Sequence, residues 1–460
     1  MKRTAYLHYS PSQSIWLDKL PSHWEQLRVK HVIDRMESGV SVNSEAAPAL
    51  PGEVGVLKTS CVYSDQFVPA ENKRVLDDEL DRVACSVKAG RLIISRMNTP
   101  DLVGSCGYVP RDYPDLFLPD RLWQTIFNAT RGCSPRFAWY YLISQPAKSA
   151  ISSLAAGTSG SMQNIGQDAF MGISFPLPPL DEQQAIVGFL DEKTLQIDAL
   201  VAQKRQLIEK LKEKRHALIA RTVTRGLPPQ AARAAGLESN PELKDSAMEW
   251  YGPIPAHWKI TKLKHATSRV FDCPHDTPDY DPSGAYCVVR TADISSGVLD
   301  LSRAYRVDEP EYLRRIRRAA VLPLDVLYGR EGERWGFAVV APVEPKVCLG
   351  QRMMQFRAGD RFNPRFLMWH LNARPVYEQG ALDTSGSTAP HVNVETIRNY
   401  RLVEPPLPEQ EAIANFIDDQ TSELDLLAEG VQKAMMRLTE YRQSLVTSAI
   451  TGKIDVRESA

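Results

Sequence analysis

Two segments of the chain carry a long helical pattern of hydrophobic and polar positions. Residues 181–225 contain no proline, and apolar side chains recur there at intervals of three, four or seven residues. These side chains are Ile186, Leu190, Ile197, Leu200, Leu207, Leu211 and Leu218. The second segment, from Glu409 to about Thr451, repeats the pattern with Ile413, Ile417, Leu424, Leu427, Val431, Leu438 and Leu445. The spacing predicts two long helices, each with an apolar seam of the coiled-coil kind.

The ends of the first segment are typical of helix termini. It begins with Asp181 and Glu182 and ends with Arg225, so the charges at both ends interact favourably with the helix dipole. Gly226 and Pro228 follow and are typical of residues that end a helix. Neither helix could bury its apolar stripe alone, so we expect the two to pack together. A whole globular segment separates them, which favours an antiparallel pair. Residues 227–247, rich in alanine and proline, are interpreted as a linker.

A globular segment precedes each predicted helix. Both contain short β-rich runs broken by glycine and proline, such as 91–95 and 337–340, and then short helical patterns at 137–143 and 366–371. A Ser-Gly-Ser turn and a Pro-Pro pair lead into the long helix. This composition of elements predicts an α+β fold with two similar mixed α/β domains joined by an antiparallel coiled coil.

The two halves of the chain are diverged copies of one unit. Residues 16–24 (WLDKLPSHW) match residues 250–258 (WYGPIPAHW), and residues 178–186 (PPLDEQQAI) match residues 405–413 (PPLPEQEAI). The copies agree at their ends and differ in their interiors. The predicted divisions are a first domain at 1–180, a helix at 181–226, a linker at 227–247, a second domain at 248–404 and a helix with its tail at 405–460.

Composition narrows the class of protein. The 55 Lys+Arg and 56 Asp+Glu give a formal net charge of −1, so nucleic-acid binding would have to come from local patches. The 7 cysteines are scattered and form no CxxC pair, which is typical of reduced cytoplasmic thiols and not of a disulfide framework or a zinc site. No apolar run is long enough for a membrane span, and the amino-terminal residues lack the apolar core of a signal peptide.

Catalytic motifs are missing from the sequence. It contains no phosphate-binding G-x4-G-K-[ST] loop, no H-E-x-x-H and no G-x-S-x-G. His23 and His257 each precede a tryptophan at equivalent places. We interpret them as satisfied histidines beside a buried aromatic side chain, in preference to metal ligands or catalytic groups. The prediction is therefore a chain without catalytic or metal-binding residues.

Basic and amide side chains gather in and beside the β-rich runs. Arginine and lysine match guanine in the major groove, asparagine and glutamine match adenine, and the remaining positive charge suits phosphates. The candidates for DNA contact are Lys58, Arg96, Asn98, Arg121 and Gln124 in the first copy and Arg290, Arg314, Arg315, Arg317, Arg318, Arg330, Arg334, Arg352 and Gln355 in the second. For any one of them, the alternative is a solvated surface charge.

These candidates divide into two expected roles. Arg330 and Gln355 are favoured for base contacts because equivalent residues, Arg96 and Gln124, occur in the first copy. The run 314–318 is favoured for phosphate contacts, because four guanidinium groups within five residues repel one another unless anions are near.

The whole combination resembles the specificity subunit of type I restriction–modification systems. The resemblance rests on the Pro-Pro-Leu-x-Glu-Gln-x-x-Ile motifs at 178–186 and 405–413, the Pro-x-His-Trp motifs ending at Trp24 and Trp258, the Thr-Ser-Gly-Ser turns at 158–161 and 384–387, and the terminal segment 451–455. It covers essentially the whole chain. It implies that the globular segments are target-recognition domains and that the helices form a conserved coiled coil.

The resemblance also implies partners and a division of labour. Double-stranded DNA, two modification (methyltransferase) subunits and restriction (translocase and nuclease) subunits would bind this chain. S-adenosylmethionine, ATP and Mg²⁺ would act on those partners, with no cofactor here. Two different readers would recognise the halves of an asymmetric bipartite site, and the coiled coil would set their spacing and dock the modification subunits. The alternatives are a coiled-coil scaffold without DNA recognition and a self-contained restriction enzyme, which the missing catalytic motifs disfavour.

Overall fold

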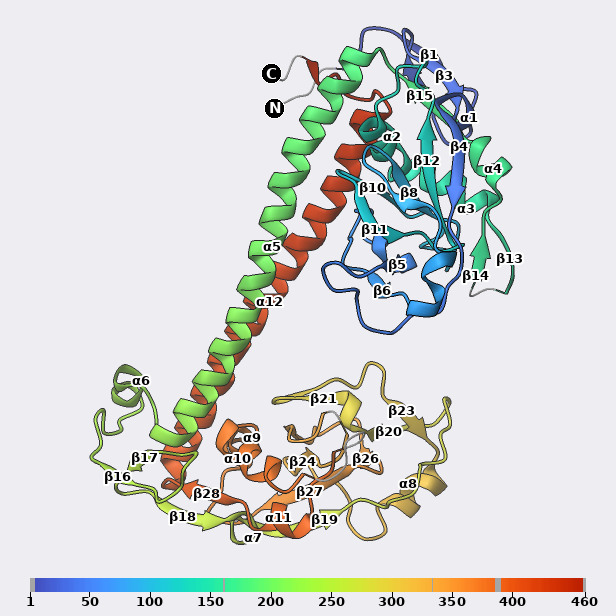
Figure 1. The fold of residues 1–460 in the computed structure, drawn as a ribbon. Coiled ribbons are helices and arrows are strands. Elements are labelled where there is room, and N and C mark those ends of the chain that lie inside the picture. The colour runs from blue at the N-terminus through green and yellow to red at the C-terminus, as the bar shows by residue number, and fades with distance from the viewer. Residues whose placement is uncertain (1–4, 160–161, 333, 385–389, 458–460) are drawn as a thin grey trace. The chain divides into compact units, whose positions relative to one another are not determined.

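The computed structural model describes residues 5–159, 162–332, 334–384 and 390–457 (Figure 1). It divides into two compact units: unit 1 comprises residues 1–204 and 433–460, and unit 2 comprises residues 205–432. Helices α5 (Leu180–Arg225) and α12 (Leu407–Ile450) contribute residues to both units and agree with the two predicted helices to within two residues. The predicted Ser-Gly-Ser turns lie outside the described residues, at positions 160–161 and 385–387.

Unit 1 is built on small sheets. A four-stranded antiparallel sheet has the order β10-β8-β12-β4, and a second has the order β6-β5-β11-β7 with β5 and β11 parallel. The strands are β1 (Tyr9–Pro11), β2 (Lys19–Pro21), β3 (Glu25–Arg28), β4 (Ile33–Ser38), β5 (Gly55–Leu57), β6 (Asn72–Arg74), β7 (Ser86–Val87), β8 (Leu92–Ser95), β9 (Met97–Asn98), β10 (Cys106–Tyr108), β11 (Tyr113–Phe117), β12 (Leu122–Phe127), β13 (Ala156–Ser159), β14 (Met162–Asn164) and β15 (Ser174–Leu177). Its short helices are α1 (Val29–Val32), α2 (Pro135–Leu142), α3 (Gln145–Leu154), α4 (Gln167–Met171), η1 (Thr59–Val62) and η2 (Asp77–Arg82).

Unit 2 repeats this plan. A four-stranded antiparallel sheet has the order β19-β27-β24-β25, and a three-stranded sheet, β23-β20-β26, has β20 and β26 parallel. The strands are β16 (Leu243–Asp245), β17 (Pro253–Pro255), β18 (Lys259–Lys262), β19 (Thr267–Asp272), β20 (Tyr286–Val289), β21 (Ile294–Ser295), β22 (Val298–Leu299), β23 (Tyr305–Val307), β24 (Val326–Gly329), β25 (Ala338–Val340), β26 (Val347–Leu349), β27 (Met353–Ala358) and β28 (Arg401–Glu404). Its short helices are α6 (Pro229–Ala234), α7 (Leu263–Ala266), α8 (Glu309–Arg315), α9 (Pro364–Leu371), α10 (Arg374–Ala381), α11 (Val394–Arg398) and η3 (Thr291–Asp293).

The two large sheets correspond strand by strand. The order β10-β8-β12-β4 of unit 1 is matched by β25-β24-β27-β19 of unit 2, and α2 and α9 pack against the corresponding sheets. The fold class predicted from the internal repeat, two similar mixed α/β domains with two long helices, is therefore confirmed.

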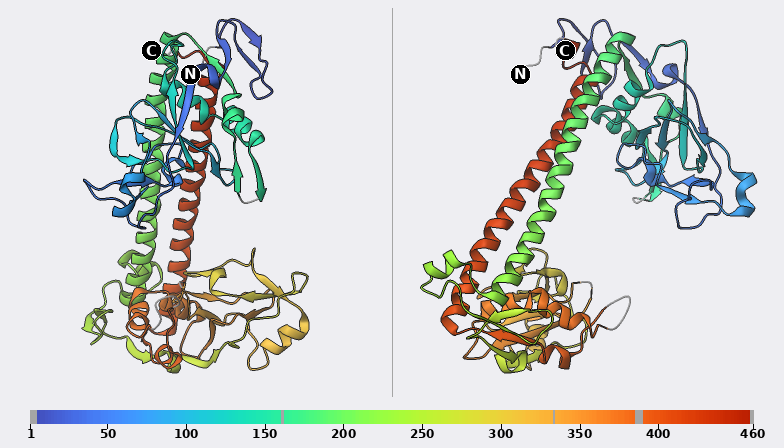
Figure 2. Two further views of the ribbon diagram at one scale, coloured as in Figure 1. Left: turned by 45° about the vertical axis from the view of Figure 1, so that its right-hand side comes forward. Right: turned by 60° about the vertical axis from the view of Figure 1, so that its left-hand side comes forward.

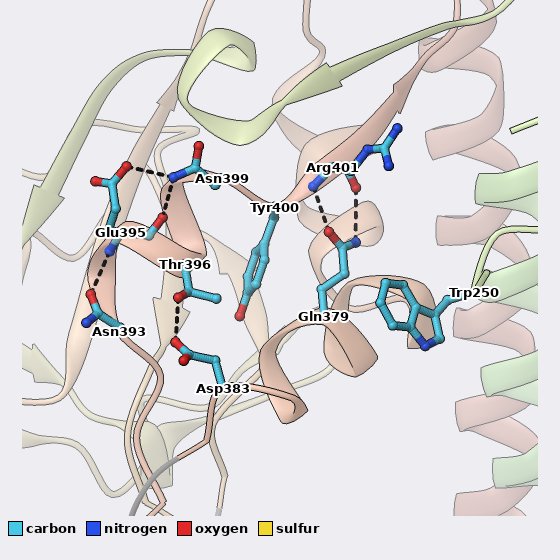
Figure 3. Close-up of a pocket in the computed structure, with 9 residues that line it drawn as sticks. All are labelled: Trp250, Gln379, Asp383, Asn393, Glu395, Thr396, Asn399, Tyr400 and Arg401. Carbon is cyan, nitrogen blue, oxygen red and sulfur yellow. Dashed lines mark hydrogen bonds between the residues drawn. The ribbon is translucent and has the colours of Figure 1, made fainter. Parts of the chain in front are cut away.

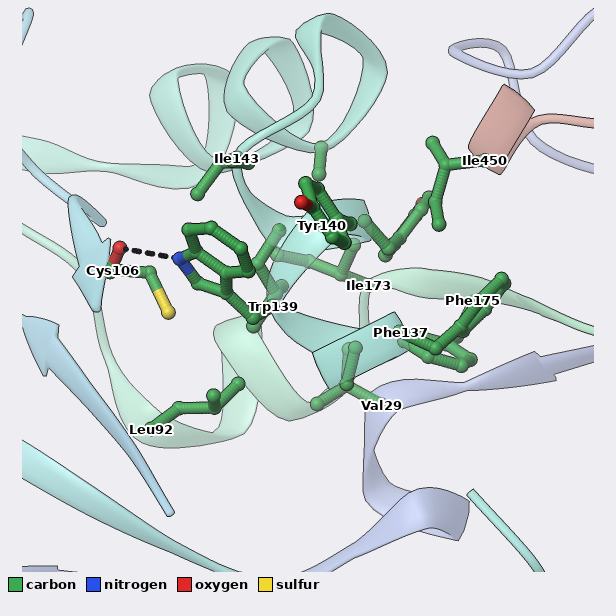
Figure 4. Close-up of a cluster of buried hydrophobic side chains, with 14 of the residues drawn as sticks. Val29, Leu92, Cys106, Phe137, Trp139, Tyr140, Ile143, Ile173, Phe175 and Ile450 are labelled. Atoms are coloured by element: carbon green, nitrogen blue, oxygen red, sulfur yellow. Dashed lines mark hydrogen bonds between the residues drawn. The ribbon is translucent and has the colours of Figure 1, made fainter. Parts of the chain in front are cut away.

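The core of unit 1 forms where α2 meets the sheet. Phe137, Tyr140 and Trp139 of α2 are buried, and the indole nitrogen of Trp139 donates a hydrogen bond to the carbonyl oxygen of Cys106 at 3.2 Å (Figure 4). Ile450 of α12 belongs to the same cluster. This end of the long helix is thus fixed to the globular part of its unit by apolar packing.

Within each unit, a stretch of α5 lies beside a stretch of α12 and runs antiparallel to it (Figures 1 and 2). In unit 1, Asp198 accepts two hydrogen bonds from the Arg442 guanidinium, at 2.9 and 3.3 Å, and Ile186 shares a core with Ile450. In unit 2, Arg215 pairs with Asp425 at 3.2 Å, while residues further along α5 pack with residues earlier in α12.

The predicted seam is correct at most positions and wrong at three. Ile186, Leu190, Ile197, Leu211, Ile413, Ile417 and Leu424 are buried, and Leu438 is partly buried. In contrast, Leu200, Leu207 and Leu427 are exposed by 45%, 39% and 51%. The seam of α5 includes Thr194, which is buried, and Lys204, which is half-buried. A prediction that uses apolar side chains alone omits these two polar positions and assigns the seam to neighbouring leucines instead.

Candidate nucleic-acid interface

A pair of arginines meets at one end of the large sheet in unit 1. Arg96 follows β8 and Arg121 precedes β12, and the Arg96 amide donates a hydrogen bond to the carbonyl oxygen of Arg121 at 3.1 Å. The Ile165 amide donates to the Arg96 carbonyl oxygen at 3.0 Å, which holds the segment after the β13–β14 hairpin against the same place. The tertiary fold thus brings together two of the predicted DNA contacts.

Unit 2 carries the same arrangement. The Arg330 amide donates to the carbonyl oxygen of Arg352 at 3.1 Å, and the Val392 amide donates to the carbonyl oxygen of Arg330 at 3.2 Å. A hollow of about 480 Å³ lies beside Arg330 and is also lined by His391 and Asn393. The arginine pair at the sheet end is therefore a property of the repeat.

The side chains of these two pairs have different surroundings. The Arg96 guanidinium lies 5.9 Å from the ring centre of Trp123, and Arg121 is exposed; neither forms an ion pair with a described residue. Arg330 is only 8% exposed and pairs with Glu331 at 2.5 Å and with Asp272 at 3.5 Å. Arg352 is exposed and has no ion-pair partner among the described residues. Arg121 and Arg352 are consequently the members of the pairs that are free to meet a ligand.

In each unit, a second basic residue directly follows a strand that pairs in parallel with its neighbour. Lys58 comes directly after β5, and Arg290 directly after β20. Lys58 lies 3.7 Å from Glu71, whereas Arg290 donates to both carboxylate oxygens of Asp293, at 2.9 and 2.7 Å. The hydrogen bonds that Arg290 donates to Asp293 raise the pKa of Arg290. The Arg290 guanidinium also lies 3.7 Å from the ring centre of the exposed Tyr305, so it is held in place by its neighbours.

The two glutamines expected to read adenine are buried inside the fold. Gln124 donates to the carbonyl oxygen of Ser86 at 3.1 Å and accepts from the amide of Lys88 at 2.9 Å. Gln355 donates to Asp325 at 2.7 Å and to the carbonyl oxygen of Ala320 at 3.1 Å. Each is 1% exposed. This placement is inconsistent with the predicted base contacts, because both amides already tie strands to neighbouring loops.

Asn98 has a similar internal role. It is buried, its amide nitrogen donates to the hydroxyl of Tyr63 at 2.8 Å, and its oxygen accepts from the amide of Thr99 at 2.9 Å. Base reading by Asn98 is therefore also inconsistent with the structure.

The arginine run at the end of α8 divides into two pairs. The Arg315 side chain is 0% exposed and donates to the carbonyl oxygens of Leu349, Asp276 and Pro274, at 2.8, 3.3 and 3.3 Å. Arg314 binds Glu311 and Asp276, and its hydrogen bonds hold the pKa of both carboxyl groups below the usual range. The expected repulsion between neighbouring guanidinium groups is thus relieved inside the protein, and the prediction of phosphate contacts does not fit this pair.

The other members of the basic set remain on the surface. Arg317 and Arg318 are exposed and have no ion pair with a described residue. Arg334 is exposed and donates to the carbonyl oxygen of Ala292 at 3.2 Å. These three stay candidates for contact with DNA phosphates.

Each histidine of the repeated motif contacts a glutamate beside a buried tryptophan, which agrees with the interpretation of these histidines as satisfied side chains. His23 lies 2.8 Å from the buried Glu182, which also accepts a hydrogen bond from the indole of Trp24 at 3.0 Å. In unit 2, His257 lies 2.8 Å from Glu409 beside the buried Trp258. Neither glutamate was predicted as the partner of its histidine, although both repeats carry this residue in their Pro-Pro-Leu-x-Glu motifs.

The comparison with known proteins identifies the family. A family model described as the type I restriction modification DNA specificity domain matches residues 21–210 and 277–433, about three quarters of the chain. The chain therefore belongs to the family of type I restriction–modification specificity subunits. Subunits of this family are non-catalytic, and DNA recognition is the function that the family implies.

Individual relatives agree with this assignment. The specificity subunit of type I restriction enzyme MjaVIII from Methanocaldococcus jannaschii is 20% identical over 315 residues, which are 67% of this chain and 68% of that protein. The EcoBI specificity subunit from Escherichia coli is 24% identical over 309 residues, 66% of this chain and 63% of that protein. The matched segments thus cover about two thirds of this chain and about two thirds of each of these relatives.

A solved structure shows the same fold. A chain from a structure of complex assembly and conformational transition in the type I restriction–modification system matches with a TM-score of 0.67 at 15% identity, covering 95% of this chain and 99% of that one. Among the described residues of the present chain, no helix combines the length and the apolar character needed to cross a membrane.

Proposed function

We propose that this chain reads two different half-sequences of one asymmetric, bipartite DNA site. The observation that carries the proposal is the arginine pair at the sheet end, which both units share but surround differently. Arg96 and Arg121 have no ion-pair partner among the described residues, whereas Arg330 is held by Glu331 and Asp272. Two recognition domains that share a fold but differ in the side chains around the arginine pair recognise different bases.

We further propose that α5 and α12 set the spacing between the two half-sequences. Each helix contributes buried residues to both units: Ile186 and Ile219 of α5, and Ile450 and Ile413 of α12, lie in the respective cores. A change in helix length would therefore act on both units at once, and the number of unread bases would follow it.

Docking of two modification subunits is the third part of the proposal. Leu200 of α5 and Leu427 of α12 occupy matching positions in the repeated helices, and both are exposed. Exposed leucines at matching places suit two copies of one apolar helical partner. In this proposal, those subunits bind S-adenosylmethionine and perform the methyl transfer, while restriction subunits use ATP and Mg²⁺ to translocate and cleave DNA.

The test is methylation-sensitive sequencing of DNA from cells that express the chain with its modification subunit. A bipartite methylated sequence is the expected result. Arg121→Ala should relax one position in one half-sequence, and Arg352→Ala one position in the other, each by about 1–3 kcal/mol of discrimination. A lack of sequence preference with an intact complex would favour the alternative, a coiled-coil scaffold without DNA recognition.

A further inference from the structure

One tryptophan of unit 2 lies on the surface between two hollows. Trp250 is 37% exposed, although tryptophan is a side chain that folding usually covers. It lines a hollow of about 390 Å³ and also a second hollow of about 460 Å³, whose lining is drawn in Figure 3. An exposed aromatic side chain that borders two adjacent hollows is typical of an anchor at a protein–protein interface.

The smaller hollow is basic. Arg221 and Arg225 of the last turns of α5 and Arg374 at the start of α10 line it together with Trp250. Arg221 and Arg225 are exposed and form no ion pair with a described residue. Arg374 donates through Nε to Glu378 at 3.0 Å, which leaves its two terminal nitrogens for another acceptor. Three guanidinium groups and one carboxylate give this place a local excess of positive charge.

The dipole of α5 explains only part of this cluster. Cations in the last turn of a helix interact favourably with its free carbonyl groups, which accounts for Arg225. It does not account for Arg374, which belongs to another helix, or for the exposed indole of Trp250. An anionic ligand would explain all of these residues together.

The larger hollow decides between two kinds of anionic ligand. It is lined by amide and hydroxyl groups of Gln379, Asn393 and Thr396, and its charged groups are the carboxylates of Asp383 and Glu395 and the guanidinium of Arg401 (Figure 3). The Gln379 amide is already hydrogen-bonded to the Arg401 backbone and the Thr396 hydroxyl to Asp383, so the amide nitrogen of Asn393 is the group of these three that can donate to a peptide C=O group. The two carboxylates would repel the closely spaced phosphates of a nucleic acid. The hollow next to Trp250 therefore favours a peptide over DNA.

The equivalent place in unit 1 lacks the basic cluster. Trp16 is 38% exposed and lines a hollow of about 500 Å³, with Asp101, Gln145 and Lys148 around it. Lys148 is already paired with Asp65. The exposed tryptophan is thus shared by both repeats, but among the described residues only the hollow of unit 2 has an excess of arginine.

We propose that Trp250, Arg221, Arg225 and Arg374, here named the Trp250 surface, bind an extended acidic peptide segment of the modification subunit. An apolar side chain of that segment packs on Trp250, and a carboxylate lies among the three arginines. This rests on the proposed function for the identity of the partner. Because the described residues of unit 1 form no such cluster, we expect the segment of one of the two bound modification subunits to be held in this way.

The experiment measures the affinity and stoichiometry of the complex between the full chain and its purified modification subunit, by light scattering and by titration. Trp250→Ala should weaken one of the two binding steps by roughly thirtyfold, the effect of losing an interface anchor. The double variant R221E/R225E should weaken the same step, and its affinity should depend less on salt than that of the unchanged chain. Trp250→Phe should retain most of the affinity.

Matched controls separate this effect from loss of folding or of charge. Trp16→Ala removes the equivalent tryptophan of unit 1, and Arg233→Glu reverses an exposed charge in α6 that does not line the hollow. Both control variants should bind the modification subunit with the affinity of the unchanged chain at the step that Trp250→Ala weakens. We expect the Trp250→Phe variant to retain its affinity for the modification subunit and R221E/R225E to keep an unchanged unfolding transition. These two results would show that the substitutions act at the Trp250 surface and would support the proposal.

Two results would overturn the proposal. One is an unchanged affinity for both steps in Trp250→Ala and R221E/R225E. The other is weaker DNA binding with unchanged subunit affinity, which would assign the surface to nucleic acid. If the unchanged chain bound no modification subunit at all, the docking part of the proposed function would fail as well; binding that ignores these substitutions would refute the Trp250 surface alone.

Discussion

The divided arginine run of α8 gives a sharp test, because neighbouring residues should respond in opposite ways. Arg315→Ala would leave the carbonyl oxygens of Leu349, Asp276 and Pro274 without their donor and would remove one of the two cations beside the buried Glu311, which keeps Arg314. Breaking a buried, charged network of this kind costs about 3–5 kcal/mol. We expect a loss of that size in the free energy of unfolding, measured by urea denaturation.

Removal of the exposed pair should act on DNA binding and not on folding. Arg317→Ala with Arg318→Ala removes two solvated side chains, so the free energy of unfolding should change by no more than about 0.5 kcal/mol. Each lost phosphate contact lowers the slope of log affinity against log salt by about 0.9, so the slope should fall by about 1.8. The assay is binding of the complex with its modification subunit to matched and mismatched duplexes at several salt concentrations.

The control is Arg315→Lys, which keeps the positive charge but cannot reach three carbonyl oxygens from one planar group. It should therefore destabilise unit 2 almost as much as Arg315→Ala. The reasoning is refuted if Arg315→Ala leaves unfolding unchanged and flattens the salt dependence as the exposed pair does. It is also refuted if the double variant changes sequence preference, because phosphate contacts carry no base information.

Three further predictions concern the helices, a buried carboxylate and a buried histidine. Insertion of one heptad after Lys204 and another after Gln432 lengthens each helix by about 10.5 Å, so methylation sequencing should show a spacer longer by about three base pairs, with both half-sequences unchanged; a fixed spacer would refute the role of the helices. Glu182→Ala should lower the unfolding free energy by about 3–5 kcal/mol and Glu409→Ala by about 1–3 kcal/mol, because Glu182 binds Tyr6, His23 and Trp24 whereas Glu409 binds only His257 among the described residues; equal losses would contradict this. Burial lowers the pKa of His370 to about 3, and an unfolded histidine titrates near 6.5, so protons bind the unfolded state preferentially and stability should fall as the pH drops from about 6.5 toward 3, by up to about 1.4 kcal/mol per pH unit. Urea titrations of His370→Phe should lack that contribution, and an unchanged pH dependence would show that His370 is not its source.

The sequence by itself determined the repeat, the two long helices and the family. The helix of residues 181–225 was readable because heptad spacing, acidic residues at its start and proline after its end are all local signals. The sequence alone also shows the matching motifs around Trp24 and Trp258 and around Glu182 and Glu409. Local signals are enough here because a helix is built from hydrogen bonds between residues that are close in the chain.

Only the tertiary structure decided which polar side chains face outward. Gln124 and Arg315 are of residue types that commonly contact DNA, yet both are buried because distant strands and loops supply their hydrogen-bond partners. The seam of α5 likewise accepts Thr194, while Leu200 stays outside it. The composition of a segment gives the hydrogen-bonding capacity of each side chain, but whether that capacity is used internally depends on groups that folding brings from elsewhere in the chain.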